Sequence, residues 1–124
     1  NKNGILIIET PLPYSIDNFI FKGFWEGYHI PRHFNLWTKD NMIKMLEKEG
    51  YKLIEFKKII KPIHWTISIQ NYLIDKKLPR SIIKFFDITS RLPIPLILFT
   101  MVDLALLTFF RTASGARYVV AKQL

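Results

Sequence analysis

Gly4-Ile5-Leu6-Ile7-Ile8-Glu9-Thr10-Pro11 is a short, continuous apolar run bounded by a glycine and a proline. Such a run predicts a β-strand that is buried on both faces, as in a parallel sheet covered by helices. Its carboxyl end, Glu9-Thr10-Pro11, leads into a loop that is rich in aromatic and ionisable side chains. We therefore expect the rest of the fold to be organised around this strand and the loop that follows it.

A helix and a second strand come after the loop. Thr38 is a suitable N-cap, apolar residues recur at helical spacing through 42–46, and Gly50 supplies a left-handed stop. Residues 51–60 mix apolar with charged side chains, which predicts a strand with one more exposed face. A strand, a long loop, a helix and a strand make one half of a doubly wound α/β unit, in which ligands bind outside the carboxyl ends of the strands.

The loop is the candidate site, and its sequence is Trp25-Glu26-Gly27-Tyr28-His29-Ile30-Pro31-Arg32-His33-Phe34-Asn35-Leu36-Trp37-Thr38. Loops lie at the surface and often carry binding groups. His33 can remove a proton near neutral pH, because an unperturbed imidazole has a pKa of about 6.5, or it can fix the loop by bonding to a backbone carbonyl. Arg32 can bind a carboxylate or phosphate, or pair with Glu9 or Glu26 within the protein.

The remaining candidate residues for binding a substrate are Glu9, Thr10, Trp25, Tyr28 and His29. The aromatic members can line an acceptor pocket or cover the core ahead of the helix. His29 and His33 lie four residues apart, which is a zinc-binding spacing on a continuous helix. Gly27 and Pro31 argue against such a helix, so we expect no metal.

Four groups of residues form a recognisable pattern: Asn3 to Pro11; then Trp25, Gly27, Pro31-Arg32-His33, Leu36 and Thr38; then Leu46 to Leu53; and finally Gly115 to Lys122. This pattern resembles the carboxyl-terminal half of class I S-adenosylmethionine-dependent methyltransferases, in particular those close to the ubiquinone and menaquinone pathway enzymes. The likeness covers about the first half of the chain and its last ten residues; the middle corresponds to a variable, apolar insertion.

The resemblance implies an α/β fold, namely the carboxyl-terminal part of a Rossmann-like, doubly wound sheet. Residues 4–10, 51–60 and 116–122 would form one sheet, with the last strand antiparallel and between the first two. The helix that begins after Thr38 would back the sheet, and residues 62–112 would be a helical insertion that acts as a lid. The whole chain, residues 1–124, would then be a single-domain fragment.

The resemblance also implies a function. The intact protein would transfer a methyl group to a small, apolar or lipid-like acceptor, with His33 as the catalytic residue. The family holds S-adenosyl-L-methionine with a glycine-rich turn after its first strand and an acidic residue after its second, and this chain has neither feature. The cofactor would therefore be bound mainly by an amino-terminal half of the same protein, and we expect this fragment alone to be inactive.

Composition limits the classes that remain. The chain has 124 residues, 49% of them hydrophobic, which is enough for one buried core. It contains no cysteine, so disulfides and thiolate metal sites are excluded. The net charge of +8 attracts anionic partners. Because the basic residues flank apolar segments rather than alternate with exposed aromatics, we expect no nucleic-acid partner. We also expect the protein to be cytoplasmic, with peripheral contact at the inner face of the membrane left open.

The insertion should be helical. Residues 64–73 predict one helix, and a second should start at Pro79 and turn Ile82, Ile83, Phe85 and Phe86 inward. The segment 92–110 is the most hydrophobic of the chain, but Asp103 near its middle would cost about 2.5–3.5 kcal/mol at a bilayer centre. A membrane span, a helix buried in the protein, and a helix that touches a membrane or a lipidic substrate all remain open for it.

Two functions of other classes also remain open. One is a non-enzymatic, basic module that binds a membrane surface, suggested by the net charge and the segment 92–110. The other is a nucleic-acid-binding module, suggested by the sequence pI of about 9.8 and the aromatic content of 15%. A steep dependence of binding on salt would indicate phosphate contacts.

Overall fold

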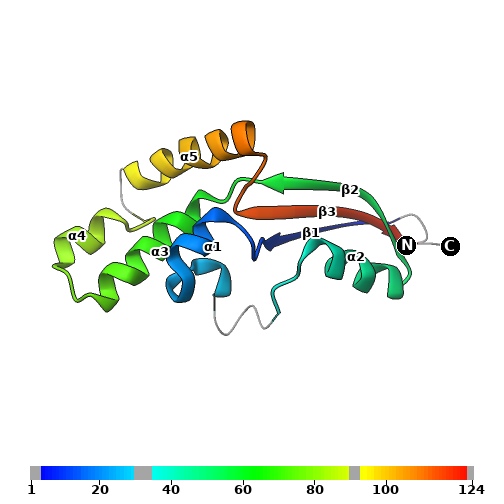
Figure 1. Ribbon diagram of the computed structural model, residues 1–124, viewed down its shortest axis with the longest axis horizontal. Helices are drawn as coiled ribbons and strands as arrows, with labels where there is room; N and C mark the ends of the chain where they lie inside the picture. Colours follow the sequence, from blue (N-terminus) through cyan, green and yellow to red (C-terminus); the bar gives the residue numbers. More distant parts are fainter. Residues whose placement is uncertain (1–3, 30–34, 90–92, 123–124) are drawn as a thin grey trace.

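The structure is a computed structural model that describes residues 4–29, 35–89 and 93–122. A three-stranded sheet lies at one end and a cluster of helices at the other (Figure 1). The strands are β1 (Ile5–Pro11), β2 (Tyr51–Ile59) and β3 (Gly115–Lys122). The α-helices are α1 (Ile16–Phe21), α2 (Lys39–Lys48), α3 (Pro62–Asp75), α4 (Arg80–Phe85) and α5 (Ile94–Phe110), with two short 3-10 helices, η1 (Lys22–Phe24) and η2 (Glu26–Tyr28).

The strand order is β1-β3-β2, and β3 pairs antiparallel with both neighbours. Tyr118 at the centre of β3 lies opposite Ile8 of β1 and Phe56 of β2. The prediction that the last strand is antiparallel and lies between the first two is therefore confirmed. The pairing is antiparallel throughout the described sheet, so it differs from the parallel ladder of a doubly wound sheet.

One face of the sheet packs on α2. The core consists of Met42 and Leu46 of α2 against Ala116, Tyr118 and Val120, which alternate along β3. The N-cap and the stop that the sequence predicts for α2 are both observed. Thr38 Oγ1 accepts a hydrogen bond from the Asn41 backbone N–H at 3.2 Å, and Gly50 after the helix has a φ of 77°.

The expectation that the first strand is buried on both faces is wrong. Ile5 and Ile7 are 65% and 59% exposed, respectively. β1 has a single neighbour, β3, and the side chains that alternate with its core-facing residues lie on the face opposite α2. An apolar run indicates that a strand could be buried, but burial needs a second layer, and no described helix packs on that face of β1.

The insertion is helical, as predicted, with α3, α4 and α5 as its described elements and no strand among its described residues. The expected inward face of α4 is partly wrong. Ile83 and Phe86 are half-buried, but Ile82 and Phe85 are exposed. α4 is only six residues long and packs mainly on α3, so it cannot cover its whole apolar surface.

The same substitution should have very different effects on α2 and α5. Leu46 is 4% exposed and Leu104 is 47% exposed. We expect Leu46→Ala to lower the free energy of unfolding by about 2–5 kcal/mol, because it leaves a cavity between α2 and β3. Leu104→Ala should cost less than about 1 kcal/mol. Urea unfolding followed by circular dichroism measures both. Equal losses would contradict the observed packing of α5.

Candidate functional site

The candidate site lies where the carboxyl ends of β1 and β2 meet the helical cluster. Both strands point toward the helices, and β3 begins at the same end of the sheet (Figure 1). The segment after β1 forms α1, η1 and η2, and all three contact α3. Strand ends, the loop that follows β1 and the insertion are thus brought together, which is the arrangement in which open α/β sheets bind ligands.

Glu9 is held by two cations at this end of the sheet. Its Oε2 accepts a hydrogen bond from Lys61 Nζ at 2.6 Å, and its Oε1 accepts from Arg117 Nε at 2.8 Å and from a terminal nitrogen of Arg117 at 2.6 Å. Arg117 lies directly opposite Glu9 in the pairing of β1 with β3. The bonds from Lys61 and then from Arg117 hold the pKa of Glu9 below its ordinary value. Glu9 is therefore an ionised anchor and is poorly suited to accept a proton.

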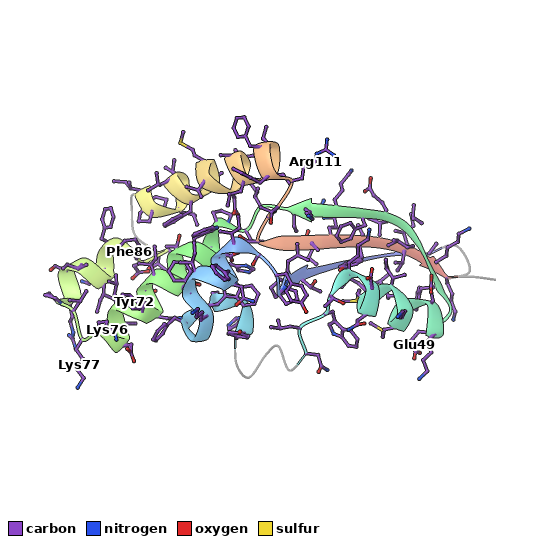
Figure 2. All side chains as sticks on the ribbon, in the orientation of Figure 1. Glu49, Tyr72, Lys76, Lys77, Phe86 and Arg111 are labelled. Atoms are coloured by element: carbon purple, nitrogen blue, oxygen red, sulfur yellow. The ribbon has the colours of Figure 1, made fainter. Side chains whose placement is uncertain are left out.

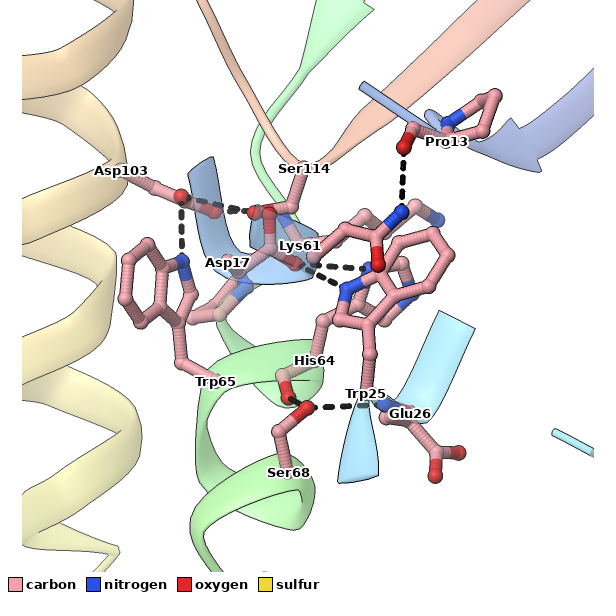
Figure 3. A network of polar contacts seen from close by, with 12 residues as sticks. Pro13, Asp17, Trp25, Glu26, Lys61, His64, Trp65, Ser68, Asp103 and Ser114 are labelled. Carbon is pink, nitrogen blue, oxygen red and sulfur yellow. Dashed lines mark hydrogen bonds and ion pairs between the residues drawn. The ribbon is translucent and has the colours of Figure 1, made fainter. Parts of the chain in front are cut away.

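A second carboxyl, Asp17 of α1, is completely buried beside the loop (Figure 3). Trp25 Nε1 donates a hydrogen bond to Asp17 Oδ2 at 2.6 Å, and His64 Nδ1 lies 3.7 Å from the same oxygen. The rings of Trp25 and His64 meet edge to face with centroids 5.9 Å apart. This cluster attaches the loop after β1 to the first turn of α3.

The loop is also bound to α3 one turn further on. The Glu26 backbone N–H donates to Ser68 Oγ at 2.8 Å, and Ser68 Oγ donates in turn to the carbonyl of His64. Gly27 lies directly against the indole of Trp25, so a side chain at position 27 would collide with that ring. The glycine is therefore required for the close approach of η2 to Trp25.

The third carboxyl, Asp103 of α5, is also completely buried and satisfies three donors. Its Oδ1 accepts from Trp65 Nε1 at 2.8 Å and from Ser114 Oγ at 3.1 Å, and its Oδ2 accepts from the Lys61 backbone N–H at 2.8 Å. Burial raises the pKa of Asp103 above its ordinary value, although the three hydrogen bonds oppose that shift. Nearby Asp17 adds to the rise.

Three buried polar atoms on the segment from β1 to α1 accept and donate no hydrogen bond among the described residues. They are Thr10 Oγ1, Ser15 Oγ and Asp17 Oδ1. Buried polar atoms are usually hydrogen-bonded, because an unmet group costs free energy. The carboxyl end of β1 thus retains unused hydrogen-bonding capacity.

The structure brings most of the sequence-predicted site residues to this region, but in different settings. Glu9 lies in its ion cluster, and Thr10 lies beside it in β1. Trp25 is buried against Asp17, and the Tyr28 ring packs edge-on against Trp25 with centroids 5.2 Å apart. His29 follows η2 with a φ of 34°, and its Nδ1 lies 3.7 Å from a Glu26 carboxylate oxygen. Arg32 and His33 lie outside the described residues.

Two carboxyls and one imidazole of the network were not predicted as site residues from the sequence. Asp17 and His64 carry no recognisable motif, because the contact between them joins residues far apart in the chain. For Asp103 the sequence indicates only a cost to membrane insertion. An acidic residue in an otherwise apolar helix is itself a signal, since such a residue needs partners.

The described residues contain no group of three or more His, Asp or Glu side chains placed to hold a metal ion. They do contain an open, mainly apolar pocket of about 380 Å³ beside the network, lined by residues 20–24 and Tyr72. A second pocket of about 340 Å³ lies at the sheet end and is lined in part by Leu12, Lys39 and Thr112. Both pockets adjoin the segment that follows β1.

Comparison of the chain with protein-family models, with curated protein sequences and with solved structures gives no match.

The hydrogen bond between Trp25 and Asp17 should contribute measurably to stability. Trp25→Phe removes the indole N–H and leaves the buried Asp17 carboxyl without that donor, so we expect the free energy of unfolding to fall by about 1–3 kcal/mol. Trp37→Phe is the matched control, because Trp37 is only partly buried at the edge of the core. Urea unfolding of both variants checks this. Equal effects would mean that ring volume, rather than the hydrogen bond, dominates.

The raised pKa of Asp103 makes a signed prediction about pH. The unfolded chain loses this proton near pH 3.8, and the folded chain keeps it to a higher pH. Between those values the folded state binds more protons, so its stability falls as pH rises. We expect the free energy of unfolding of the wild type, minus that of Asp103→Asn, to decrease as pH rises from acid to neutral.

Glu9→Gln is the control for this measurement. The pKa of Glu9 is lowered, so its contribution is present above its ordinary pKa and is lost as pH falls. The difference between wild type and Glu9→Gln should therefore change in the opposite direction. If the difference in unfolding free energy between wild type and Asp103→Asn grew with pH instead, the three hydrogen bonds to Asp103 would lower its pKa by more than burial raises it.

Proposed function

We propose that this chain is the carboxyl-terminal, acceptor-side portion of an S-adenosylmethionine-dependent methyltransferase that acts on a small, apolar or lipid-like acceptor. The observation that carries the proposal is the strand arrangement. The last strand is antiparallel and lies between two strands that run in the same direction, with α2 connecting those two along the chain. The resemblance of the sequence to the Rossmann-like methyltransferases implies this order.

The path of the chain gives further support. The segment after β1 and the helical insertion both gather beyond the carboxyl ends of β1 and β2 (Figure 1). In the proposed enzyme, the segment after β1 and the insertion form one wall of the acceptor site. Thr10, Tyr28 and His29 belong to this wall. Glu9 and Trp25 shape that wall from within, because the first is held by Lys61 and Arg117 and the second is buried against Asp17.

An apolar acceptor suits the surfaces available. The pocket between η1 and α3 is lined by Ile20, Phe21, Phe24 and Tyr72, with Gly23 and Lys22 completing it. Small-molecule pockets are usually lined by such side chains and a few polar groups that fix orientation. Lys22 is the one charged residue among the described residues that line this pocket.

The described residues do not fit the cofactor by themselves. Gly27 lies against Trp25, Gly50 ends α2, and Gly115 lies against Lys61, so these glycines have local packing or turn roles. None of them belongs to a glycine-rich turn between a strand and a helix. The proposal therefore assigns cofactor binding to an amino-terminal half of the same protein, and we assign this chain only groups that face the acceptor.

The coding sequence upstream of Asn1 provides the first test. The proposal requires a glycine-rich turn after a strand there, followed about twenty residues later by an acidic residue. An upstream reading frame without that pattern would overturn it.

Substitutions at Arg32 and His33 in the protein that includes the upstream half give the second test. If His33 is a general base, His33→Ala should lower turnover by about 10²–10⁴-fold, with cofactor affinity unchanged and with partial rescue by added imidazole. If Arg32 binds an anionic group of the acceptor, Arg32→Ala should raise KM for the acceptor instead. Folded variants that turn over normally would mean that both residues have structural roles only.

A further inference from the structure

We propose that the outer face of α5, in a chain whose net charge is +8, binds the surface of an anionic lipid bilayer. The inference goes beyond methyl transfer and does not depend on it. It starts from an unusual surface: α5 is seventeen residues long, and its only ionisable residue, Asp103, is completely buried. The whole exposed surface of this helix is therefore uncharged.

The exposed side chains of α5 form a continuous apolar stripe. They include Ile94, Ile97, Leu98, Met101 and Leu104, which fall at the i, i+3, i+4 and i+7 spacing of one helix face, and Phe109 further along. Met101 at the centre of the stripe is 65% exposed. Stripes at this spacing lie on one helix face and normally pack against something apolar. Exposed apolar patches of this kind mark interaction surfaces.

Even the hydroxyl groups of α5 are satisfied within the helix. Thr100 Oγ1 donates to the carbonyl of Leu96 at 2.8 Å, and Thr108 Oγ1 donates to the carbonyl of Leu104 at 2.7 Å. Asp103 receives its three donors from α3, from Lys61 and from Ser114 on the inner side. The outer face thus presents no hydrogen-bonding group that a hydrocarbon environment would leave unpaired.

The inner face of α5 is fixed to the protein. The rings of Trp65 and Phe99 stack with centroids 5.5 Å apart and an angle of 8° between their planes, next to the bonds of Asp103. No described helix is long and apolar enough to cross a membrane. A helix attached along one side and apolar along the other is suited to lie in the plane of a bilayer surface, with its apolar face among the acyl chains.

The charge of the chain favours an anionic bilayer, because its net charge is +8. Arg111 lies where α5 returns to the sheet, whereas Lys76 and Lys77 lie at the far end of the helical cluster, on the side away from α5 (Figure 2). Arg80 and Lys84 of α4 are also exposed, on a short helix whose Ile82 and Phe85 are exposed as well. Apolar side chains accompanied by lysine and arginine are the composition of interfacial helices that bind anionic lipids.

Other occupants fit this face less well. A further strand of the same protein would be expected at the free edge of β1, which is the opposite edge of the sheet from β2. α5 is tied to the β2 side, because Lys58 of β2 donates to the carbonyl of Arg111 at 2.6 Å. A second copy of this chain is distinguished by the labelling experiment, because it would cover the stripe without vesicles.

Fluorescent labelling tests the proposal directly, because the chain has no cysteine and a single introduced one is unique. Met101→Cys places an environment-sensitive fluorophore on the outer face of α5, and Ile7→Cys places it on the open face of the sheet at similar exposure. We expect vesicles of phosphatidylcholine and phosphatidylglycerol in equal amounts to shift the Met101 label to the blue and raise its emission severalfold. The Ile7 label should change little, and vesicles of phosphatidylcholine alone should bind weakly.

Three results would overturn the proposal. Equal responses from the two labels would indicate that the protein adheres to vesicles without using α5 in particular. No response from the Met101 label would exclude the bilayer as the partner of α5. A blue-shifted Met101 label without vesicles would mean that protein, either a second copy or another segment, covers α5.

Charge and apolar variants give an independent measurement by vesicle co-sedimentation. Arg111→Glu with Arg80→Glu and Lys84→Glu should lower the bound fraction on the anionic vesicles severalfold, as should Ile97→Gln with Met101→Gln. Ile5→Gln with Ile7→Gln is the matched control and should bind as the wild type does. Circular dichroism confirms that each variant is folded. Folded variants that all bind like the wild type would exclude this surface.

Discussion

The buried carboxyl of Asp103 joins four parts of the chain at one point. It belongs to α5, receives the indole N–H of Trp65 in α3, the hydroxyl of Ser114 just ahead of β3, and the backbone N–H of Lys61 just after β2. A buried carboxyl is costly to place and more costly to leave without partners. Because its donors come from the end of β2, from α3 and from the start of β3, this one group holds the helical insertion in position on the sheet.

A second buried carboxyl continues the same arrangement toward the loop. Asp17 of α1 receives the indole of Trp25 and lies beside His64 at the start of α3. Two adjacent residues of α3, His64 and Trp65, therefore face the two carboxyls, one toward the loop after β1 and the other toward α5. The insertion and the loop are thereby ordered relative to the strand ends. A site for an acceptor at those strand ends needs this order, since catalysis and binding depend on groups held in place.

The inward turn of Asp103 also explains the surface of the insertion. Asp103, the one ionisable residue of α5, is buried against α3 and the strand ends. The side of α5 that faces away from the protein therefore carries only uncharged, mostly apolar side chains. The proposals for an apolar acceptor and for a lipid surface both arise from this division, but from different faces: the first from the pocket beside α3, the second from the outer stripe of α5.

The sequence by itself determined the three strands, α2 and the helical character of the insertion, but it did not predict α1. The cap at Thr38, the stop at Gly50 and the apolar spacing of α2 are local signals. They are readable in the sequence because they depend on hydrogen bonds and steric limits between residues close together in the chain. The order of the three strands followed from a resemblance that spans the sheet-forming segments. The site was only partly visible in the same way: Glu9, Thr10 and the loop residues were indicated, whereas Asp17 and His64 were not.

The tertiary structure alone decided which apolar surfaces are buried and which polar groups meet. An apolar run such as Ile5–Ile8 shows that burial is favourable, but whether a second layer exists is a property of the whole arrangement, and here the face of β1 opposite α2 is open. The carboxyls of Asp17 and Asp103 meet His64 and Trp65 of α3, which lie far away along the chain, through contacts that no local pattern encodes. Hydrogen bonds between distant segments form only after the sheet and helices have brought the partners within reach, so only the folded chain reveals them.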